Sequence, residues 1–461
     1  MTEIESGDQA VRDEDYVLND RLFGSVRLAI AGEDGARLRE LLDPLHAADI
    51  ADFLEQVDGG ARREILRLAP EVIDGEVLSD LNEGLREEVI AFLPPEQLAE
   101  AVRELDSDDI VDLLEDLDAP QQVAVLDALE DADRVAVENS LGYPEFSAGR
   151  LMQREVVMAP EHWTVGEAID HLRAKEDLPE QFYHIVLVDP RLRPVGQVPL
   201  GKLMAARRSV NLKDIAEEDF RAIPVTQEEG DVAYAFNQYH LISAPVVDDG
   251  GRLVGVITID DAMIVLDEEH EEDIMRLAGV GDMASVSDNA LETAKGRLPW
   301  LVINLFTASL SAIVISQFED TISALVILAA LMPIVASTGG IAGTQSLAVA
   351  VRSLATRDLT RANARRVIVR ELGAGLLNGL GLAVVLGLGG TLIFGDVMLG
   401  VVLGLAMIAN QIVAALGGVL FPLALDRLGF DPALSSGTFV TTMTDVMGFF
   451  AFLGFATLLL I

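Results

Sequence analysis

Five long apolar segments occupy the C-terminal part of the sequence and constrain its fold more than any other feature. They cover approximately residues 298–318, 322–351, 367–394, 397–425 and 433–461. Each is long enough to cross the hydrocarbon core of a bilayer as a helix, which takes roughly 20 residues. In lipid every backbone N–H and C=O group must be satisfied within the protein, so a crossing segment is helical. The sequence therefore predicts a five-helix transmembrane domain over residues 297–461.

Arginines set the expected orientation of these segments. Six cluster where the second segment ends and the third begins: Arg352, Arg357, Arg361, Arg365, Arg366 and Arg370. Because basic residues accumulate in short cytoplasmic loops, this loop is predicted to be cytoplasmic. Counting outward places the N-terminal part in the cytoplasm and the C-terminus outside the cell membrane. Residues 1–16 are polar and acidic, so we expect no cleaved signal peptide.

Asp445 lies near the middle of the last apolar segment. A carboxylate at the bilayer centre costs about 2.5–3.5 kcal/mol even on the insertion scale, so it faces the protein interior or a water-filled path. Hydroxyls of the neighbouring Thr441, Thr442 and Thr444 make the place suitable for a hard cation, which prefers oxygen ligands. The alternative is a protonated or hydrogen-bonded aspartate that serves helix packing only.

The second apolar segment is too long for one straight crossing and carries Pro333 and several glycines. These residues are expected to loosen the helix and expose carbonyls, which membranes tolerate only beside protein or a watery cavity. The candidate pore-lining residues are Gly339, Gly340, Gly343 and Thr344. Close packing of helices through small residues is the alternative.

The charge of the chain is divided unevenly. Residues 298–461 hold only eight acidic and seven basic residues, so nearly all of the net charge of −42 lies in the first 297. Such an acidic part repels nucleic acid, and no nucleic-acid partner is expected. With only four lysines, its surface resembles that of proteins adapted to a very salty cytoplasm, where screening tolerates dense charge. Cation binding is the alternative explanation.

The absence of cysteine excludes disulfides, Fe–S clusters and thiolate zinc sites.

Residues 1–146 are predicted to form an all-α superhelix. Two stretches, 46–55 and 107–116, each place an acid before an apolar i, i+3, i+4 stripe, which is typical of an N-capped helix. Repeated helices of this kind bury their stripes between neighbours. The acids form either a solvated face or a cation-sensing surface, in which Asp108 and Asp109 are candidate regulatory ligands.

From about residue 147 strands alternate with helices, and the same order occurs in residues 147–207 and 208–266. The second unit ends in an Asp-Gly turn, a strand over 253–258 and a helix, and it resembles the cystathionine β-synthase (CBS) module. This resemblance implies a pseudo-symmetric α/β pair with clefts able to hold an adenine nucleotide such as ATP. The module's ribose-binding acid, three residues after a threonine, matches Thr258 and Asp261; the first unit has Pro199 and Lys202 instead. A purely structural or dimerising pair is the alternative.

Residues 267–296 connect the second CBS module to the membrane. They continue a helix predicted over 260–278 that carries a row of acids: Asp267, Glu268, Glu269, Glu271, Glu272 and Asp273. Like charges at i, i+4 destabilise a helix by roughly 0.2–0.5 kcal/mol per pair. A cation bridging this row to the acidic N-terminal part would remove that penalty. A solvated linker helix is the alternative.

The membrane part contains several short motifs in a fixed order: 299–304, 318–320, Pro333 with 339–345, 352–358, 371–379, 431–433 and Thr444-Asp445. In this order, and with the preceding domains, they resemble the MgtE family of magnesium channels over nearly the whole chain. The resemblance implies a homodimer whose five-helix halves enclose one cation path, with Asp445 in the pore. It also implies that cytosolic Mg²⁺ binds between the N-domain, the CBS modules and the connecting helix, and closes the channel.

Two positions depart from this pattern. Ile341 stands where the family's Gly-Gly-Asn-Ala-Gly motif has asparagine, and Ile264 replaces an acid of the connecting helix. The remaining gating acids match Asp261, Glu269, Glu272 and Asp273. The sensor is therefore expected to be retained but altered.

The resemblance predicts a Mg²⁺-selective channel and not an enzyme. The soluble part has no Walker sequence and no nucleophile–base set. Two alternatives remain: a transporter for Co²⁺ or Mn²⁺, which Ile341 makes conceivable, and a membrane-anchored ion or nucleotide sensor without transport. Asp445 and the interrupted second segment argue against the sensor, because an anchor needs neither.

Overall fold

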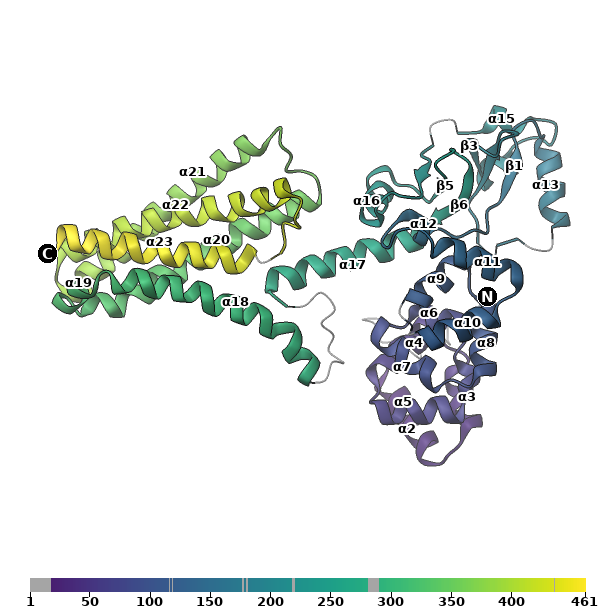
Figure 1. The fold of residues 1–461 in the computed structure, drawn as a ribbon, viewed down its shortest axis with the longest axis horizontal. Coiled ribbons are helices and arrows are strands. Elements are labelled where there is room, and N and C mark those ends of the chain that lie inside the picture. The colour runs from purple at the N-terminus through teal and green to yellow at the C-terminus, as the bar shows by residue number, and fades with distance from the viewer. Residues whose placement is uncertain are drawn as a thin grey trace. The chain divides into compact units, whose positions relative to one another are not determined.

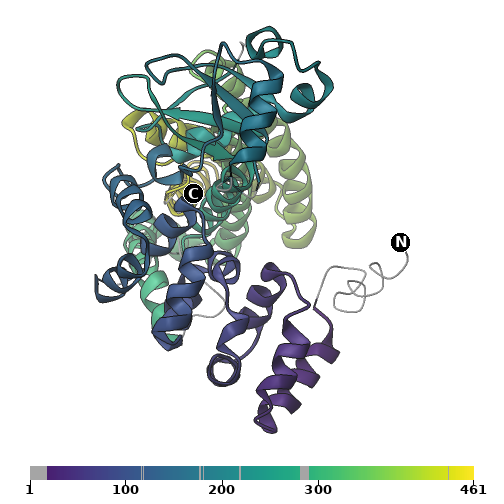
Figure 2. The ribbon, with the colours of Figure 1, turned by 90° about the vertical axis from the view of Figure 1, so that its right-hand side faces the viewer.

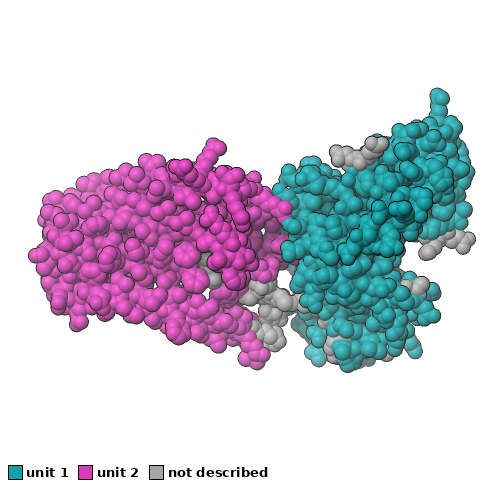
Figure 3. Space-filling view, turned by 45° about the horizontal axis from the view of Figure 1, so that its top comes forward, with its two compact units in different colours: residues 1–266 teal, residues 267–461 magenta. Residues whose placement is uncertain are grey.

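The computed structural model describes residues 18–115, 117, 119–175, 178, 179, 181–217, 220–280, 290–434 and 436–461. It divides into two compact units, residues 1–266 and 267–461, coloured teal and magenta in Figure 3. Each unit is described by itself below. The polar segment 1–16 and residues 281–289 of the predicted connecting segment lie outside the described residues.

The first unit begins with a series of short helices (Figure 2). They are α2 (Asp20–Ala31), α3 (Gly35–Leu42), α4 (Ala47–Gln56), α5 (Gly59–Leu68), η1 (Pro70–Val72), α6 (Gly75–Asp80), α7 (Glu83–Phe92), α8 (Pro95–Glu104), α9 (Ser107–Glu115), α10 (Ala119–Ala128) and α11 (Asp131–Ser140). Side-chain caps fix many of the starts; the Asp58 carboxylate, for example, accepts hydrogen bonds from the N–H groups of Gly60 and Ala61.

Packing between near neighbours holds these helices together. α4 packs against α6, α6 against α8, and α8 against α10. The apolar stripes meet in one continuous core in which Phe53, Leu78 and Leu114 are completely buried. The predicted helical N-domain is confirmed, and its core arises because no single helix buries its own stripe.

Two small mixed sheets follow in the same unit. The first module contains β1 (Met158–Pro160), α13 (Val165–Ala174), β2 (His184–Val188), β3 (Pro194–Pro199), α14 (Leu200–Ala205) and α15 (Leu212–Ile215). The second contains β4 (Ile223–Pro224), α16 (Glu229–Tyr239), β5 (Ser243–Val247), β6 (Leu253–Thr258) and α17 (Ile259–Ala278). The short α12 (Ala148–Leu151) precedes the first module in the sequence but packs in the core of the second, against α16, β4 and β6.

The two sheets repeat one another in detail. In each, the first strand is parallel and the third antiparallel to the middle strand, in the order β1-β2-β3 and β4-β5-β6. The turns also match, because Asp189 and Asp248 each accept two backbone N–H bonds from the residues that follow them. The predicted pair of α/β modules is confirmed.

The second unit contains the last part of α17 and the membrane helices. These are α18 (Ala290–Ser316), α20 (Ile327–Ala355), α21 (Ala364–Phe394), α22 (Val397–Leu428) and α23 (Ser436–Leu459), with the short α19 (Glu319–Ala324) between the first two. All five long helices are apolar and long enough to cross a membrane. α22 packs against α20, α21 and α23, and is the most enclosed of the five (Figure 1).

The second membrane helix differs from its prediction. α20 is continuous from Ile327 to Ala355, with Pro333 and all three glycines inside it, so the loosened backbone with exposed carbonyls is not observed. The glycines instead allow other helices to approach. A Cβ atom on Gly339 would overlap the Asn410 amide of α22, and one on Gly343 would lie 2.6 Å from Val440 Cγ1 of α23. Close packing accounts for Gly339 and Gly343.

Replacing Gly418 by alanine is expected to lower the thermal unfolding temperature of the protein. The new Cβ atom would lie 2.6 Å from the Gly343 carbonyl oxygen and 2.8 Å from the Leu347 nitrogen, and backbone atoms cannot move without separating α20 from α22. Overpacking of this kind costs about 1–3 kcal/mol. Thermal unfolding in detergent checks this, with Gly381→Ala as the control, because a Cβ there meets nothing within 4 Å. Equal effects of both substitutions would contradict the explanation.

Candidate functional site: an intramembrane cavity and two acidic clusters

A cavity of about 420 Å³ lies between α20 and α23. It is lined by Ala336, Ser337, Gly340, Ile341 and Thr344 of α20, and by Thr441 and Asp445 of α23. Helical geometry explains the set: positions 337, 340, 341 and 344 follow one face of α20, and 441 and 445 are one turn apart on α23. The middle of two membrane helices thus presents a carboxylate and several hydroxyls to one space.

The structure brings half of the predicted pore residues into this lining, namely Gly340, Thr344, Thr441 and Asp445. The other four lie outside it. Gly339 and Gly343 are buried against neighbouring helices, Thr444 is completely buried, and Thr442 is half-buried. Ser337 was missed by the sequence analysis, although its i+3 and i+7 relation to Gly340 and Thr344 could have revealed it.

The hydroxyls of the lining are oriented by the helices that carry them. Thr441 Oγ1 donates to the Gly437 carbonyl oxygen at 2.8 Å, and Thr344 Oγ1 donates to the Ile341 carbonyl oxygen at 2.9 Å. With its proton so used, each hydroxyl oxygen presents only lone pairs to the cavity. A cation in this space would therefore meet the Asp445 carboxylate and hydroxyl oxygens, either directly or through its water shell.

A second group of polar residues lies near the N-terminal end of α23, in the last turn of α17 and in the segment that leads into α23. The Arg276 guanidinium, in the last turn of α17, forms ion pairs with Glu272 and with Asp431. Asp431 also accepts a hydrogen bond of 2.7 Å from the Ala433 N–H. The adjacent Leu277 packs into the apolar cluster formed by Leu347, Val351, Ala433 and Val440. The last turn of α17 is thereby attached to the segment that begins α23.

Asp273 belongs to the same group. Burial, the Asp431 carboxylate and the Glu269 carboxylate raise the pKa of Asp273 from 3.8 to about 6. A raised pKa means that the ionised form is held at a cost in free energy, because the carboxylate is partly buried and four acids share the place with one arginine. Glu269, Glu272 and Asp273, all predicted gating acids, are therefore brought together here with Asp431.

The first unit holds the other acidic cluster, where the first turn of α9 meets the first turn of α17. Burial and the nearby Asp261 carboxylate raise the pKa of Asp108 well above its ordinary value. Burial and Asp260 raise the pKa of Asp261 to about 7. Burial also raises the pKa of Asp109, whose carboxylate accepts a hydrogen bond of 2.7 Å from Ser79. The predicted ligands Asp108, Asp109 and Asp261 thus share one cluster.

The candidate nucleotide residues lie beside this cluster. Thr258 Oγ1 donates to Asp261 Oδ2 at 2.8 Å, and Thr258 is almost fully buried. Asp261 is therefore directed toward α9 and its own threonine. In the described parts of the chain, no three or more His, Cys, Asp or Glu side chains converge closely enough to hold a metal ion.

Comparison with known proteins decides the family. A family model described as a divalent cation transporter matches residues 332–455, one for the MgtE intracellular N domain matches 45–146, and the CBS domain model matches 148–209 and 212–268. The magnesium transporter MgtE of Enterococcus faecalis is 36% identical over 427 residues, which cover 91% of this chain and 93% of that protein. The MgtE of Thermus thermophilus is 34% identical over 457 residues, covering 96% and 99%. The chain belongs to the MgtE family.

Solved structures of the soluble parts of two magnesium transport proteins are also similar. The cytosolic domain of the Mg²⁺ channel MgtE in complex with ATP is 31% identical, with a TM-score of 0.48, and covers 52% of this chain and 98% of that one. The soluble part of a magnesium transporter is 25% identical, with a TM-score of 0.47, and covers 54% and 98%. Membership of the MgtE transporter family confirms the resemblance seen in the sequence and the expectation that the chain is not an enzyme.

Cation binding by this MgtE chain is expected to strengthen as the pH rises. The pKa of Asp261 is about 7, so its ionised fraction rises about tenfold between pH 6 and pH 8. Because this pKa lies above the ordinary 3.8, ionisation destabilises the folded chain as the pH rises from about 4 to 7, and a bound cation offsets that loss. The apparent Mg²⁺ affinity, measured as the Mg²⁺-dependent rise in unfolding temperature, should increase up to about tenfold. Asp261→Asn should weaken this dependence; an unchanged pH profile would contradict the assignment.

Proposed function

We propose that this chain carries Mg²⁺ across the cell membrane into the cytoplasm through the cavity between α20 and α23. The observation that carries the proposal is the position of Asp445, whose carboxylate shares the cavity with the lining residues Ser337, Thr344 and Thr441. Mg²⁺ prefers octahedral oxygen coordination and gives up its water reluctantly, and a space of about 420 Å³ admits a largely hydrated ion. The similar proteins of Enterococcus faecalis and Thermus thermophilus are magnesium transporters, which supports the choice of ion.

A second copy of the chain completes the path in this proposal. Ser337, Ile341 and Thr344 form an exposed stripe on α20, and Ile341 is 58% exposed. A stripe of hydroxyls beside a carboxylate is costly against lipid, because hydrocarbon cannot satisfy polar groups. A homodimer in which this face meets its copy would place two Asp445 carboxylates around one ion. Cross-linking of cysteines introduced at Ser337 would detect such a dimer, since the chain has no cysteine of its own.

Internal Mg²⁺ closes the path in the same proposal. The acids Asp108, Asp109 and Asp261 repel one another in the first unit, as do Glu269 and Asp273 in the second. Mg²⁺ that neutralises these clusters favours the conformation in which the acids stay together, which is a shift of population. The attachment of α17 to Asp431 offers a mechanical link, because Asp431 lies in the segment that leads to α23 and its Asp445.

Ion competition tests the identity of the transported ion. Ile341 lines the cavity at the place where the MgtE motif carries an asparagine, so one amide is missing from the lining. Uptake of Mg²⁺ into proteoliposomes should persist in the presence of equal Co²⁺ or Mn²⁺ if the path selects Mg²⁺. Preferential uptake of Co²⁺ or Mn²⁺ would assign the chain to another divalent cation. No uptake of any divalent cation would leave only a sensor.

Nucleotide binding at the CBS pair is a lesser part of the proposal. Thr258 and Asp261 hold the spacing that binds ribose in CBS modules, and only the second module has it. Since Asp261 already bonds Thr258 and faces Asp108, ATP and Mg²⁺ are expected to compete for Asp261. Calorimetric titration of the full chain with ATP, with and without Mg²⁺, checks this expectation.

A further inference from the structure

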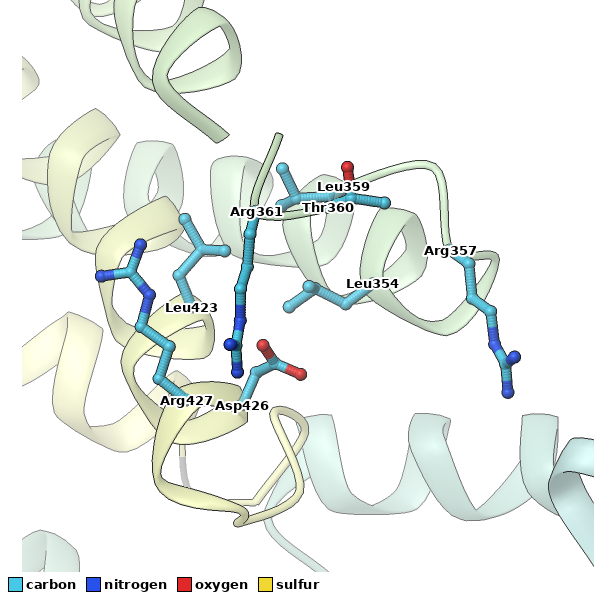
Figure 4. Close-up of a pocket in the computed structure, with 8 residues that line it drawn as sticks. All are labelled: Leu354, Arg357, Leu359, Thr360, Arg361, Leu423, Asp426 and Arg427. Carbon is cyan, nitrogen blue, oxygen red and sulfur yellow. The ribbon is translucent and has the colours of Figure 1, made fainter. Parts of the chain in front are cut away.

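The α20–α21 loop and the end of α22 enclose a second cavity, of about 380 Å³, which the transport path does not use (Figure 4). Its charged lining residues are Arg357 and Arg361 of the loop, and Asp426 and Arg427 of α22. Figure 4 shows Arg361 extending from the loop toward Asp426, with Arg357 at the opposite end of the cavity. Three arginines against one aspartate leave the lining with a net positive charge, which favours an anion.

Two of these arginines are available to a ligand. Arg361 and Arg427 are exposed, and neither side chain forms an ion pair or a hydrogen bond with any described residue. A guanidinium has a planar set of N–H donors that matches the oxygens of a phosphate group. A phosphate therefore suits the two arginines better than a halide ion does. By contrast, the nearby Arg370 is already paired with Glu371.

The loop that presents Arg361 is fixed by its own hydrogen bonds. The Thr360 N–H donates to Asn363 Oδ1 at 2.8 Å, and Asn363 Nδ2 donates to the Asp358 carbonyl oxygen at 2.6 Å. The Leu359 N–H donates to the Ser353 carbonyl oxygen at 2.6 Å, and the Leu359 side chain is buried. An ordered loop loses little entropy when a ligand binds. The loop also leads directly into α21, whose N-terminal end is the positive end of its dipole.

The surroundings favour a lipid as the source of the phosphate. The cavity lies where three membrane helices end, and its apolar lining residues are Leu354, Leu359 and Leu423. Just beyond Arg427, Leu428 is 72% exposed and Phe430 is 59% exposed. Apolar side chains next to unpaired arginines suit an amphiphile, and basic pockets between membrane helices on the cytoplasmic side bind anionic head groups. A free phosphate ion would gain nothing from the exposed apolar residues.

We propose that this cavity binds the phosphate group of an anionic phospholipid from the leaflet beside the α20–α21 loop. Arg361 and Arg427 hold the phosphate, and the lipid thereby links the loop to the end of α22. Asp426 lies in the same lining and weakens the attraction, which sets an upper limit on the affinity. The proposal does not depend on which ion the chain transports.

Lipid binding by the full chain in detergent tests this proposal. Native mass spectrometry would compare phosphatidylglycerol with phosphatidylcholine, and inorganic phosphate would be added as a competitor. We expect at least about tenfold tighter binding of phosphatidylglycerol, and at least about tenfold loss of that preference in Arg361→Gln/Arg427→Gln. The matched control is Arg365→Gln/Arg366→Gln, which removes the same charge from the first turn of α21, next to the loop, but from no lining residue; it should change the preference by less than about twofold.

Further outcomes decide the remaining alternatives. Asp426→Asn should strengthen phosphatidylglycerol binding, because it removes the negative charge from the lining. This variant tests the proposal even if the double arginine variant does not fold. Equal losses in the two arginine pairs would overturn the proposal in favour of diffuse charge attraction. Competition by millimolar inorganic phosphate equal to that by lipid would also overturn it, because the site would then take a free anion.

Discussion

Replacing Asp445 by asparagine is expected to reduce Mg²⁺ uptake into proteoliposomes by at least about 100-fold. Asparagine keeps the size of the side chain and removes its charge. Two unit charges 4 Å apart attract by about 4 kcal/mol at an effective dielectric constant of 20, and each 1.4 kcal/mol corresponds to a factor of ten. Since the lining of the cavity contains no second carboxylate, no other residue of the lining replaces this attraction.

The control for this substitution is Asp358→Asn. Asp358 is exposed in the α20–α21 loop, and its replacement changes the net charge by the same amount. Uptake by this variant should stay within about twofold of the wild type. Asp445→Glu keeps the charge and should retain more uptake than Asp445→Asn. Undiminished uptake by a folded Asp445→Asn protein would move the ion path away from this cavity.

Neutralising Glu269, Glu272 and Asp273 together is expected to make uptake insensitive to Mg²⁺ on the side of the soluble domains. The concentration of internal Mg²⁺ that halves the uptake should rise at least about tenfold. Glu272 pairs with Arg276, and burial together with repulsion by the Asp431 and Glu269 carboxylates raises the pKa of Asp273. Without this repulsion Mg²⁺ has little to neutralise there, so it no longer favours one conformation over the other.

A second triple variant controls for net charge. Glu87, Glu96 and Glu100 are exposed on α7 and α8, and their replacement by glutamine removes three negative charges far from α17 in the sequence. Inhibition by Mg²⁺ should remain in this variant. If inhibition also survives the neutralisation of Glu269, Glu272 and Asp273, the gate does not reside in this part of α17.

Local pattern was enough to predict much of the fold. Strand β6 occupies the predicted residues 253–258, and the five membrane helices lie on the five apolar segments, because periodicity and length act within a segment. The Asp-Gly turn of the second CBS module is likewise where Asp248 accepts its backbone N–H bonds. These features depend on neighbours in the sequence.

The remaining features depend on residues far apart in the chain. Gly339 could have loosened α20 or allowed another helix to pack against it. Asn410 of α22 packs against Gly339, and its Nδ2 donates to the Val335 carbonyl oxygen, 75 positions away in the sequence. The ion pair of Arg276 with Asp431 spans 155 positions and has no local signal. Ser337 is the exception, since helical spacing from Gly340 and Thr344 was present in the sequence and was not used.

The most direct test of the account is Mg²⁺ uptake by wild-type proteoliposomes under an imposed membrane potential. A potential of 100 mV, negative on the side of the soluble domains, favours entry of a divalent ion by about 4.6 kcal/mol. Uptake is expected to rise with this potential when Mg²⁺ on the soluble-domain side is low, and to stop when it is high. An absence of Mg²⁺ uptake at every potential and concentration, by protein that is folded and correctly oriented, would contradict it.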